Sequence, residues 1–84
     1  MISCQQYDYI EVACLYQIPV KLTLLSGKII EGKAMDTRYN ENKKESIVIH
    51  GPLGEIVVPT EELLTMQALI ANPHFDTIQF TQTA

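Results

Sequence analysis

Residues 4–24, CQQYDYIEVACLYQIPVKLTL, contain the point at which the pattern of apolar residues changes, and that change decides the fold. Before Pro19 the apolar residues recur every three or four positions, which is the period of a helix. After Pro19, Val20, Leu22 and Leu24 alternate with polar residues, which is the period of a strand. The sequence therefore predicts a short N-terminal helix followed directly by strands.

The predicted helix covers about residues 8–17 and begins at an acidic residue. Asp8 and Glu11 have the spacing of a capping box, in which each side chain accepts from the backbone N–H of the other residue. The helix is predicted to end before Pro19, because the residue that precedes a proline disfavours the helical conformation. We expect one side of the helix to pack on the sheet and the opposite side to join acidic and apolar residues. The first side holds Ile10, Ala13, Cys14 and Gln17, and the second holds Asp8, Glu11, Val12 and Leu15.

Turn residues divide the rest of the chain into short segments. Frequent turns between short alternating segments are typical of a small antiparallel barrel or sandwich, so the expected class is mostly β, with one helix. We predict a loop over residues 37–44, and a strand rather than a helical turn after residues 59–62. The predicted strands are 20–24, 28–36 with a bend at Gly32, 46–50, 55–58, 64–70 and 77–82. The predicted core consists of Ile10, Ala13, Val20, Leu22, Leu24, Ile30, Ile47, Ile49 and Val57.

Length and composition limit the class of protein. The 84 residues are enough for one domain, 1–84, and no apolar run approaches the roughly 20 residues of a membrane-spanning helix. The first residues lack the features of a secretory signal, so we expect a cytoplasmic protein with Cys4 and Cys14 reduced. Around His50 and His74 no arrangement of Ser, Cys or Asp suggests a catalytic triad, and the sequence has no metal-ligand motif. The sequence therefore predicts a protein that is not an enzyme and that needs no cofactor or metal.

The formal net charge of −4 is distributed unevenly along the chain. Residues 1–20 carry −2 and residues 45–84 carry −5, whereas residues 21–44 carry +3 because they contain all six basic residues. A nucleic-acid-binding domain is usually basic as a whole, since neutralisation of phosphates supplies much of its affinity. The charge therefore argues against nucleic-acid binding except by the middle segment, which contains Lys21, Lys28, Lys33, Arg38, Lys43 and Lys44.

The first two strands carry a recognisable series of residues, namely Val20-x-Leu22, Gly27, Gly32, Asp36 and Asn40. Over about residues 8–40 this series resembles the first half of an Sm-type fold, in which a helix precedes a strongly bent five-stranded barrel. Sm-type RNA binders carry an Arg-Gly pair between the last two strands, where this chain has Pro-Thr-Glu-Glu at residues 59–62. Two carboxylates at that place argue against an Sm-like RNA site.

A more specific motif lies at residues 4–14, with the pattern Cys-x-x-Tyr-Asp-x-x-Glu-x-Ala-Cys. A Leu-x-Leu strand, a glycine turn, Ala34-x-Asp36 and a charged loop follow it. In these features, over most of its length, the chain resembles the Rho-binding antiterminator family, also called Rof or YaeO. The resemblance implies an Sm-like protein that binds the transcription termination factor Rho at its N-terminal RNA-binding domain. Such a protein would block RNA access and inhibit termination.

The charge pattern and the resemblance together predict a surface that binds the partner. Asp8 and Glu11 have no basic residue within residues 1–20, so their carboxylates are suited to the places that phosphates occupy in an RNA site. Apolar contacts beside these charges are expected from the helix, and a second contact is expected from the loop at residues 38–45. The predicted partner-binding residues are Tyr7, Asp8, Glu11, Val12, Leu15, Arg38, Asn40, Lys43 and Glu45.

Other interpretations stay open. Asp8 and Glu11 alternatively form only a helix cap, Val12 and Leu15 are alternatively buried, and the loop at 38–45 is alternatively an ordinary surface turn. The whole chain is alternatively an Sm-like RNA-binding module that uses the basic segment 21–44, or an Sm-like structural ring. We expect a monomer with Rho as its partner and without direct binding to nucleic acid or membrane, because competition at one site needs only a single copy.

Overall fold

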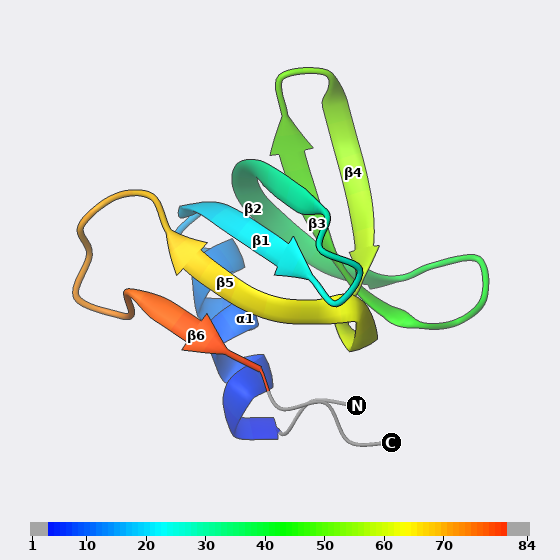
Figure 1. Ribbon diagram of the computed structural model, residues 1–84, viewed down its shortest axis with the longest axis horizontal. Coiled ribbons are helices and arrows are strands. Elements are labelled where there is room, and N and C mark those ends of the chain that lie inside the picture. Colours follow the sequence, from blue (N-terminus) through cyan, green and yellow to red (C-terminus); the bar gives the residue numbers. More distant parts are fainter. Residues whose placement is uncertain (1–3, 81–84) are drawn as a thin grey trace.

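The computed structural model describes residues 4–80 and confirms the predicted class of one N-terminal helix and antiparallel strands (Figure 1). Six strands follow the helix, and a 3₁₀ turn, η1, lies between the fourth strand and the fifth. The elements are α1 (Cys4–Leu15), β1 (Pro19–Leu24), β2 (Ile29–Tyr39), β3 (Glu45–Gly51), β4 (Gly54–Pro59), η1 (Thr60–Glu62), β5 (Leu63–Ala68) and β6 (Thr77–Gln79).

The strands form one open sheet in the order β4-β3-β2-β1-β5-β6, and every neighbouring pair is antiparallel. β2 is the longest strand, with 11 residues, and its pairing with β3 shifts register between Ala34 and Asp36. An extra residue of this kind bends a strand and increases its twist. α1 packs on β2, and the β3–β4 hairpin projects from the other end of the molecule (Figure 1).

Gly32 allows β2 and β3 to approach closely where the sheet bends. A Cβ atom at this position would lie 2.6 Å from Ile49 Cγ2 and 2.7 Å from the backbone oxygen of His50. Both distances are below van der Waals contact, so a side chain would separate the strands. The absence of a side chain at Gly32 is therefore a requirement of the core packing.

The helix differs from the prediction at both ends. α1 spans Cys4–Leu15 and not 8–17, so Asp8 lies inside the helix and the predicted capping box is wrong. Tertiary contacts hold the additional first turn, because Tyr7 packs against the core and Gln6 Nε2 donates to the backbone oxygen of Gln79 at 3.2 Å. Gln17 has a positive φ of 49° and is exposed, so it lies outside the helix and does not pack on the sheet.

Eight of the nine predicted core residues are buried, and Val57 is the exception. Val57 is 37% exposed, whereas its neighbour Val58 is 2% exposed. Val58 pairs with the fully buried Ile47, which places it on the core side of the sheet and Val57 on the other side. The prediction was wrong because three successive apolar residues at 56–58 do not show which side faces inward.

The predicted loop at 37–44 is shorter in the structure, because β2 continues to Tyr39 by pairing with the start of β3. The fifth predicted strand, 64–70, is β5 at Leu63–Ala68, and the helical turn considered before it is η1. β6 covers Thr77–Gln79 of the predicted strand 77–82, of which residues 81 and 82 lie outside the described part. Within residues 4–80, no helix is both long enough and apolar enough to cross a bilayer.

Candidate functional site

α1 presents an outer face on which carboxylates and apolar side chains lie together. Asp8 and Glu11 are exposed, and neither forms a salt bridge with any residue from 4 to 80. Leu15 follows one turn later with 73% of its surface exposed, whereas Val12 is partly buried. Because Asp8 is inside the helix, capping does not account for its presence. On the outer face of α1, two carboxylates therefore lie next to an exposed leucine, and neither carboxylate pairs with a basic side chain within residues 4–80.

Tyr7 lies where α1 meets β2 and is partly buried against the core. Burial raises the pKa of Tyr7, a hydrogen bond with the Thr37 side chain opposes this rise, and the carboxylates of Glu45 and Glu11 add to it. These effects require Thr37, Glu45 and Glu11 to be near the Tyr7 hydroxyl. The fold therefore brings three of the predicted binding residues together, although they come from the helix and from the start of β3.

Cys14 occupies the same junction, two helical turns after Tyr7. Partial burial raises the pKa of its thiol to about 11, and the carboxylates of Asp36 and Glu11 contribute to the rise. Both cysteines are free in the structure, with Cys4 exposed. A hollow of about 380 Å³ opens beside Cys14, and we call it the seam hollow. Its lining consists of Glu11, Cys14, Leu15, Met35, Asp36 and Thr37.

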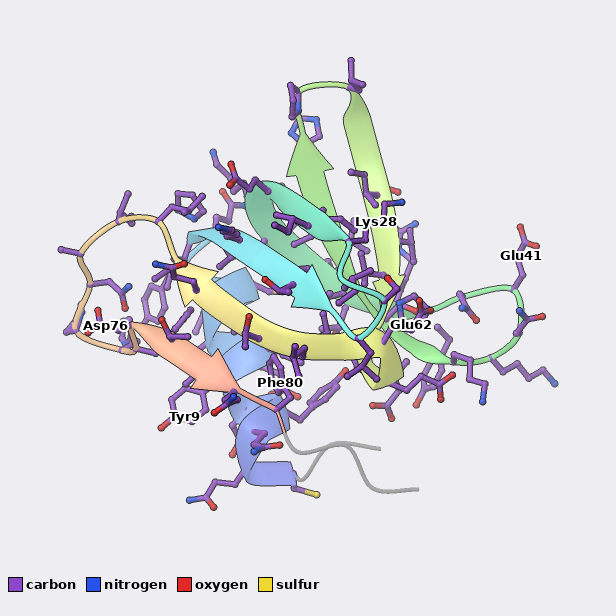
Figure 2. All side chains as sticks on the ribbon, viewed as in Figure 1. Tyr9, Lys28, Glu41, Glu62, Asp76 and Phe80 are labelled. Atoms are coloured by element: carbon purple, nitrogen blue, oxygen red, sulfur yellow. The ribbon has the colours of Figure 1, made fainter. Side chains whose placement is uncertain are left out.

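The loop between β2 and β3 is held by one side chain. Asn40 Oδ1 accepts from the backbone N–H of Asn42 and from that of Lys44, both at 2.9 Å. The backbone N–H of Asn40 donates to the oxygen of Lys44 at 2.9 Å, and Lys43 has a positive φ of 59°. Asn40 is therefore a structural residue of a tight turn, while Lys43 is exposed. Glu41, at the tip of the loop, points away from the rest of the molecule (Figure 2).

Two salt bridges fix the residues around this loop. Arg38 Nη1 lies 3.1 Å from Glu55 Oε1, and because β3 separates β2 from β4, this bridge crosses over β3. Lys44 Nζ lies 3.5 Å from Glu61 Oε2. About half of each of these side chains is exposed, so each bridge contributes only about 0–1 kcal/mol. The bridges reduce the positive charge that Arg38 and Lys44 offer to a partner.

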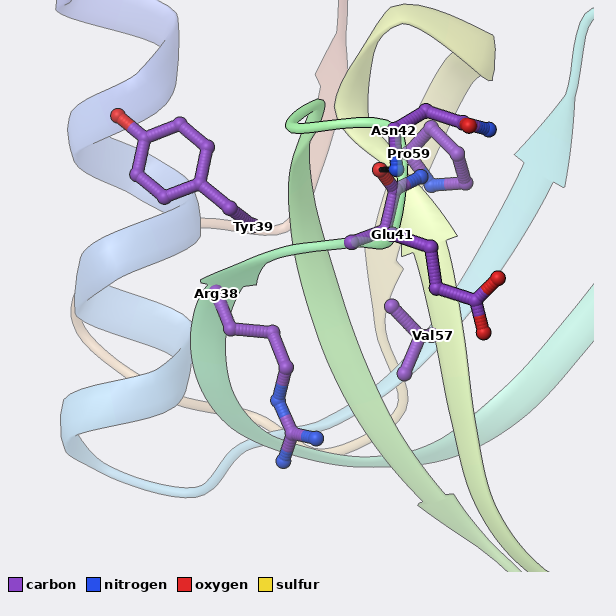
Figure 3. Close-up of a pocket in the computed structure, with 7 residues that line it drawn as sticks. Arg38, Tyr39, Glu41, Asn42, Val57 and Pro59 are labelled. Carbon is purple, nitrogen blue, oxygen red and sulfur yellow. Dashed lines mark hydrogen bonds between the residues drawn. The ribbon is translucent and has the colours of Figure 1, made fainter.

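A second hollow, of about 410 Å³, separates the loop from β4 (Figure 3). Tyr39 and Arg38 project to different sides of β2, and Tyr39 extends on the side of α1 (Figure 3). Tyr39 is 67% exposed, and its hydroxyl donates a long hydrogen bond of 3.5 Å to Glu45 Oε1. The hollow is lined by Arg38, Tyr39, Asn40, Glu41, Asn42, Val57 and Pro59.

The predicted binding residues thus form two groups on the folded chain. The first group lies at or near the junction of α1 and β2 and holds Tyr7, Asp8, Glu11, Val12, Leu15 and Glu45. The second group lies at the β2–β3 turn and holds Arg38, Asn40 and Lys43. Sequence reasoning did not place Asp36 or Tyr39 in the site. The position of Tyr39, an aromatic residue next to a polar loop, could have indicated a contact residue from the sequence. The proximity of Asp36 to Glu11 could not, because it depends on how the helix packs on the sheet.

Known proteins share this combination of sequence and fold. The family described as modulator of Rho-dependent transcription termination (ROF) matches residues 1–80. The chain belongs to this family. A solved structure, YaeO bound to magnesium from Vibrio cholerae O395, is 45% identical to the chain and has a TM-score of 0.87. The match covers 89% of this chain and 97% of that chain. The comparison with curated proteins found no match.

The family is regulatory, and its members act on termination that depends on Rho. The resemblance to the Rof or YaeO family and the expected class of one helix with a small antiparallel sheet are therefore confirmed. No group of three or more His, Cys, Asp or Glu residues in the described range, 4–80, is arranged to hold a metal ion. The described surface combines carboxylates, exposed apolar residues and hollows at the α1–β2 junction and around the β2–β3 turn.

Proposed function

We propose that this protein inhibits Rho-dependent termination by binding the N-terminal RNA-binding domain of Rho and blocking the access of RNA. Family membership supports Rho as the partner. The observation that supports the binding mode is the outer face of α1, where Asp8 and Glu11 lack a salt-bridge partner within residues 4–80. Carboxylates of this kind complement a protein surface that is rich in Arg and Lys.

The chemistry of an RNA-binding site explains why an acidic protein competes for it. Such a site offers cationic groups to phosphates and aromatic groups to bases. Asp8 and Glu11 take the places of phosphates, while Tyr7 and the exposed Leu15 supply the apolar contact that binding energy needs. Val12 is partly buried, so only part of its side chain is offered to the partner.

The β2–β3 turn supplies the second contact in this proposal. Lys43 is exposed, and Glu45 lies near Tyr7, so this segment continues the surface that begins on α1. Arg38 contacts the partner while it remains paired with Glu55, and the side chain of Asn40 holds the conformation of the turn by its hydrogen bonds. One copy of the chain carries both contacts, so the protein acts as a monomer in the cytoplasm.

RNA binding by the basic segment is the competing possibility. The fold distributes these residues over several strands, and Arg38 and Lys44 are paired with Glu55 and Glu61. Lys21 lies opposite Glu31 in the β1–β2 register. The structure thus lowers the positive charge of the segment, which weakens the electrostatic term on which RNA affinity depends.

The double variant Asp8→Asn, Glu11→Gln tests the proposal. It removes two negative charges and keeps the shape of both side chains, and Asn has about the same helix propensity as Asp. We expect a melting temperature near that of the parent and an affinity for Rho at least tenfold weaker, because amides replace charge-assisted hydrogen bonds poorly. Displacement of RNA from Rho should weaken equally, and parental binding should weaken as salt rises.

The control for lost charge is the variant Glu31→Gln, Glu62→Gln, which removes two exposed carboxylates elsewhere on the molecule. It should bind Rho like the parent. Unchanged affinity in the folded Asp8, Glu11 variant would overturn the proposed binding face. Tight, salt-sensitive binding of free RNA to the isolated protein would instead favour the basic segment.

A further inference from the structure

The seam hollow combines carboxylates and apolar side chains, which are the two kinds of group that bind a long basic side chain. α1 contributes Glu11 and Leu15 to its wall, and β2 contributes Met35 and Asp36. Its volume of about 380 Å³ lies at the lower end of the range of small-ligand pockets, about 300–1,000 Å³. The hollow is therefore large enough for one long side chain and too small for a larger structured element.

The polar part of the seam hollow carries negative charge that no basic side chain within residues 4–80 neutralises. Glu11 and Asp36 both act on the Cys14 thiol, which places the two carboxylates around the same point. Neither forms a salt bridge within the described residues 4–80. Asp36 Oδ1 accepts from the backbone N–H of Thr37 at 2.8 Å, whereas Oδ2 has no donor in the same range. One carboxylate oxygen of Asp36 and the whole carboxylate of Glu11 thus stay available.

The apolar part of the hollow lies beside these charges. Leu15 is 73% exposed and Met35 is 36% exposed, which leaves carbon surface for the stem of a side chain. Arg and Lys both cover apolar surface with their stems and keep the charged group outside. Two carboxylates that approach from different elements suit a planar guanidinium, whose five donors point outward in a fixed fork, better than a compact ammonium.

We propose that the seam hollow is a socket for one arginine side chain of the protein partner. The guanidinium donates to Glu11 and to Asp36 Oδ2, and its stem lies on Leu15 and Met35. The proposal rests on the proposed function, and it adds Asp36 and Met35 to the binding face. It also assigns the contact to arginine and not to lysine.

The variant Asp36→Asn tests the socket with little effect on the fold, because the Asn Oδ1 atom still accepts from the Thr37 N–H. We expect its affinity for Rho to fall about tenfold to a hundredfold, which is typical for loss of a hydrogen bond between charged groups. Glu31→Gln on the same strand is the matched control and should bind like the parent. Parental affinity in folded Asp36→Asn would overturn the socket.

A second measurement does not need Rho. Titration of N-acetyl-arginine amide into isotope-labelled protein should shift the backbone signals of Leu15, Asp36 and Thr37, and N-acetyl-lysine amide should shift them less. Asp36→Asn should lose this response. Equal responses to both amides, or a response at these residues to magnesium alone, would overturn the assignment to arginine. If the parent protein responds to the arginine amide at these residues but does not bind Rho, the socket is retained and the proposed function is rejected.

Discussion

Gly32 shows how one residue controls the bend of the sheet. The positions closest to its missing Cβ are a side-chain carbon of Ile49 and the backbone oxygen of His50, and the backbone oxygen cannot rotate away. We expect Gly32→Ala to lower the free energy of unfolding by about 1–3 kcal/mol through overpacking. Urea denaturation measures the change. Lys33→Ala, at an exposed neighbour on the same strand, should differ little from the parent. Equal stability of Gly32→Ala and the parent would show that the strands separate without cost.

Cys14 makes stability depend on alkaline pH. The pKa of its thiol is raised from 9.0 to about 11, so the folded protein retains the proton over a range in which the unfolded chain loses it. The unfolded state then binds fewer protons, and the contribution to stability is complete below pH 9 and decreases between pH 9 and about pH 11. Burial raises the pKa of Tyr7 too, which adds a decrease of the same sign at higher pH.

Denaturation at pH 9 and pH 11 tests this dependence on the Cys14 pKa. Cys14→Ala removes the thiol, so its stability should decrease less between the two values than the stability of the parent. Cys4→Ala, at the exposed cysteine, serves as the control and should follow the parent. An equal decrease in all three proteins would assign the alkaline loss to groups other than Cys14.

At the scale of the elements, the end of α1 sets the direction in which the chain enters the sheet. The backbone N–H of Ile18 donates to the oxygen of Ala13 at 2.9 Å, and that of Gln17 donates to Cys14 at 3.2 Å. This pair of bonds is a Schellman motif, which places the residue after the helix in the left-handed region where glycine is favoured. Gln17 occupies that position with a φ of 49°.

Gln17→Gly should therefore stabilise the protein, because it removes the strain of a side chain in the left-handed region, about 1 kcal/mol. Glu11→Gly is the control, since Glu11 is exposed in the helix interior, and there glycine should cost roughly 0.5–1 kcal/mol. Thermal unfolding of both variants measures these opposite changes. A decrease in the melting temperature of Gln17→Gly would contradict the role assigned to this turn.

At the scale of the whole molecule, the free edges of the sheet are protected from pairing with other chains. β4 ends at Pro59, which lacks a backbone N–H, and its Glu55 carries the charged bridge to Arg38. β6, at the opposite edge, has three residues in the described range. A structural ring built by strand pairing would need both edges, so the architecture favours a single copy.

We accordingly expect a monomer of 9.5 kDa over a wide range of protein concentrations, with the net charge of −4 opposing self-association. Sedimentation equilibrium measures the mass directly. A mass that increases with concentration, or a stable oligomer, would contradict the prediction and would favour the alternative of an Sm-like structural ring. Variants at Asp8 and Glu11 should not change this mass, because neither residue belongs to the edge strands β4 and β6.

The sequence by itself determined the class of fold, the family and most of the core. A change from helical to alternating period is a local property, so it is readable at Pro19 without knowledge of the tertiary structure. The motif at residues 4–14 pointed to the family, and the match over residues 1–80 confirms it. The acidic pair Asp8 and Glu11 was recognised because charge is also a local property.

Only the tertiary structure decided where the helix begins, which of Val57 and Val58 faces the core, and which carboxylates lie together. Helix start and strand phase depend on partners distant in sequence, such as Gln79 for Gln6 and Ile47 for Val58. Asp36 lies beside Glu11 because α1 packs across β2, and no spacing within either segment contains that information. Long-range packing therefore built the seam hollow from residues whose sequence pattern predicts only an ordinary helix and strand.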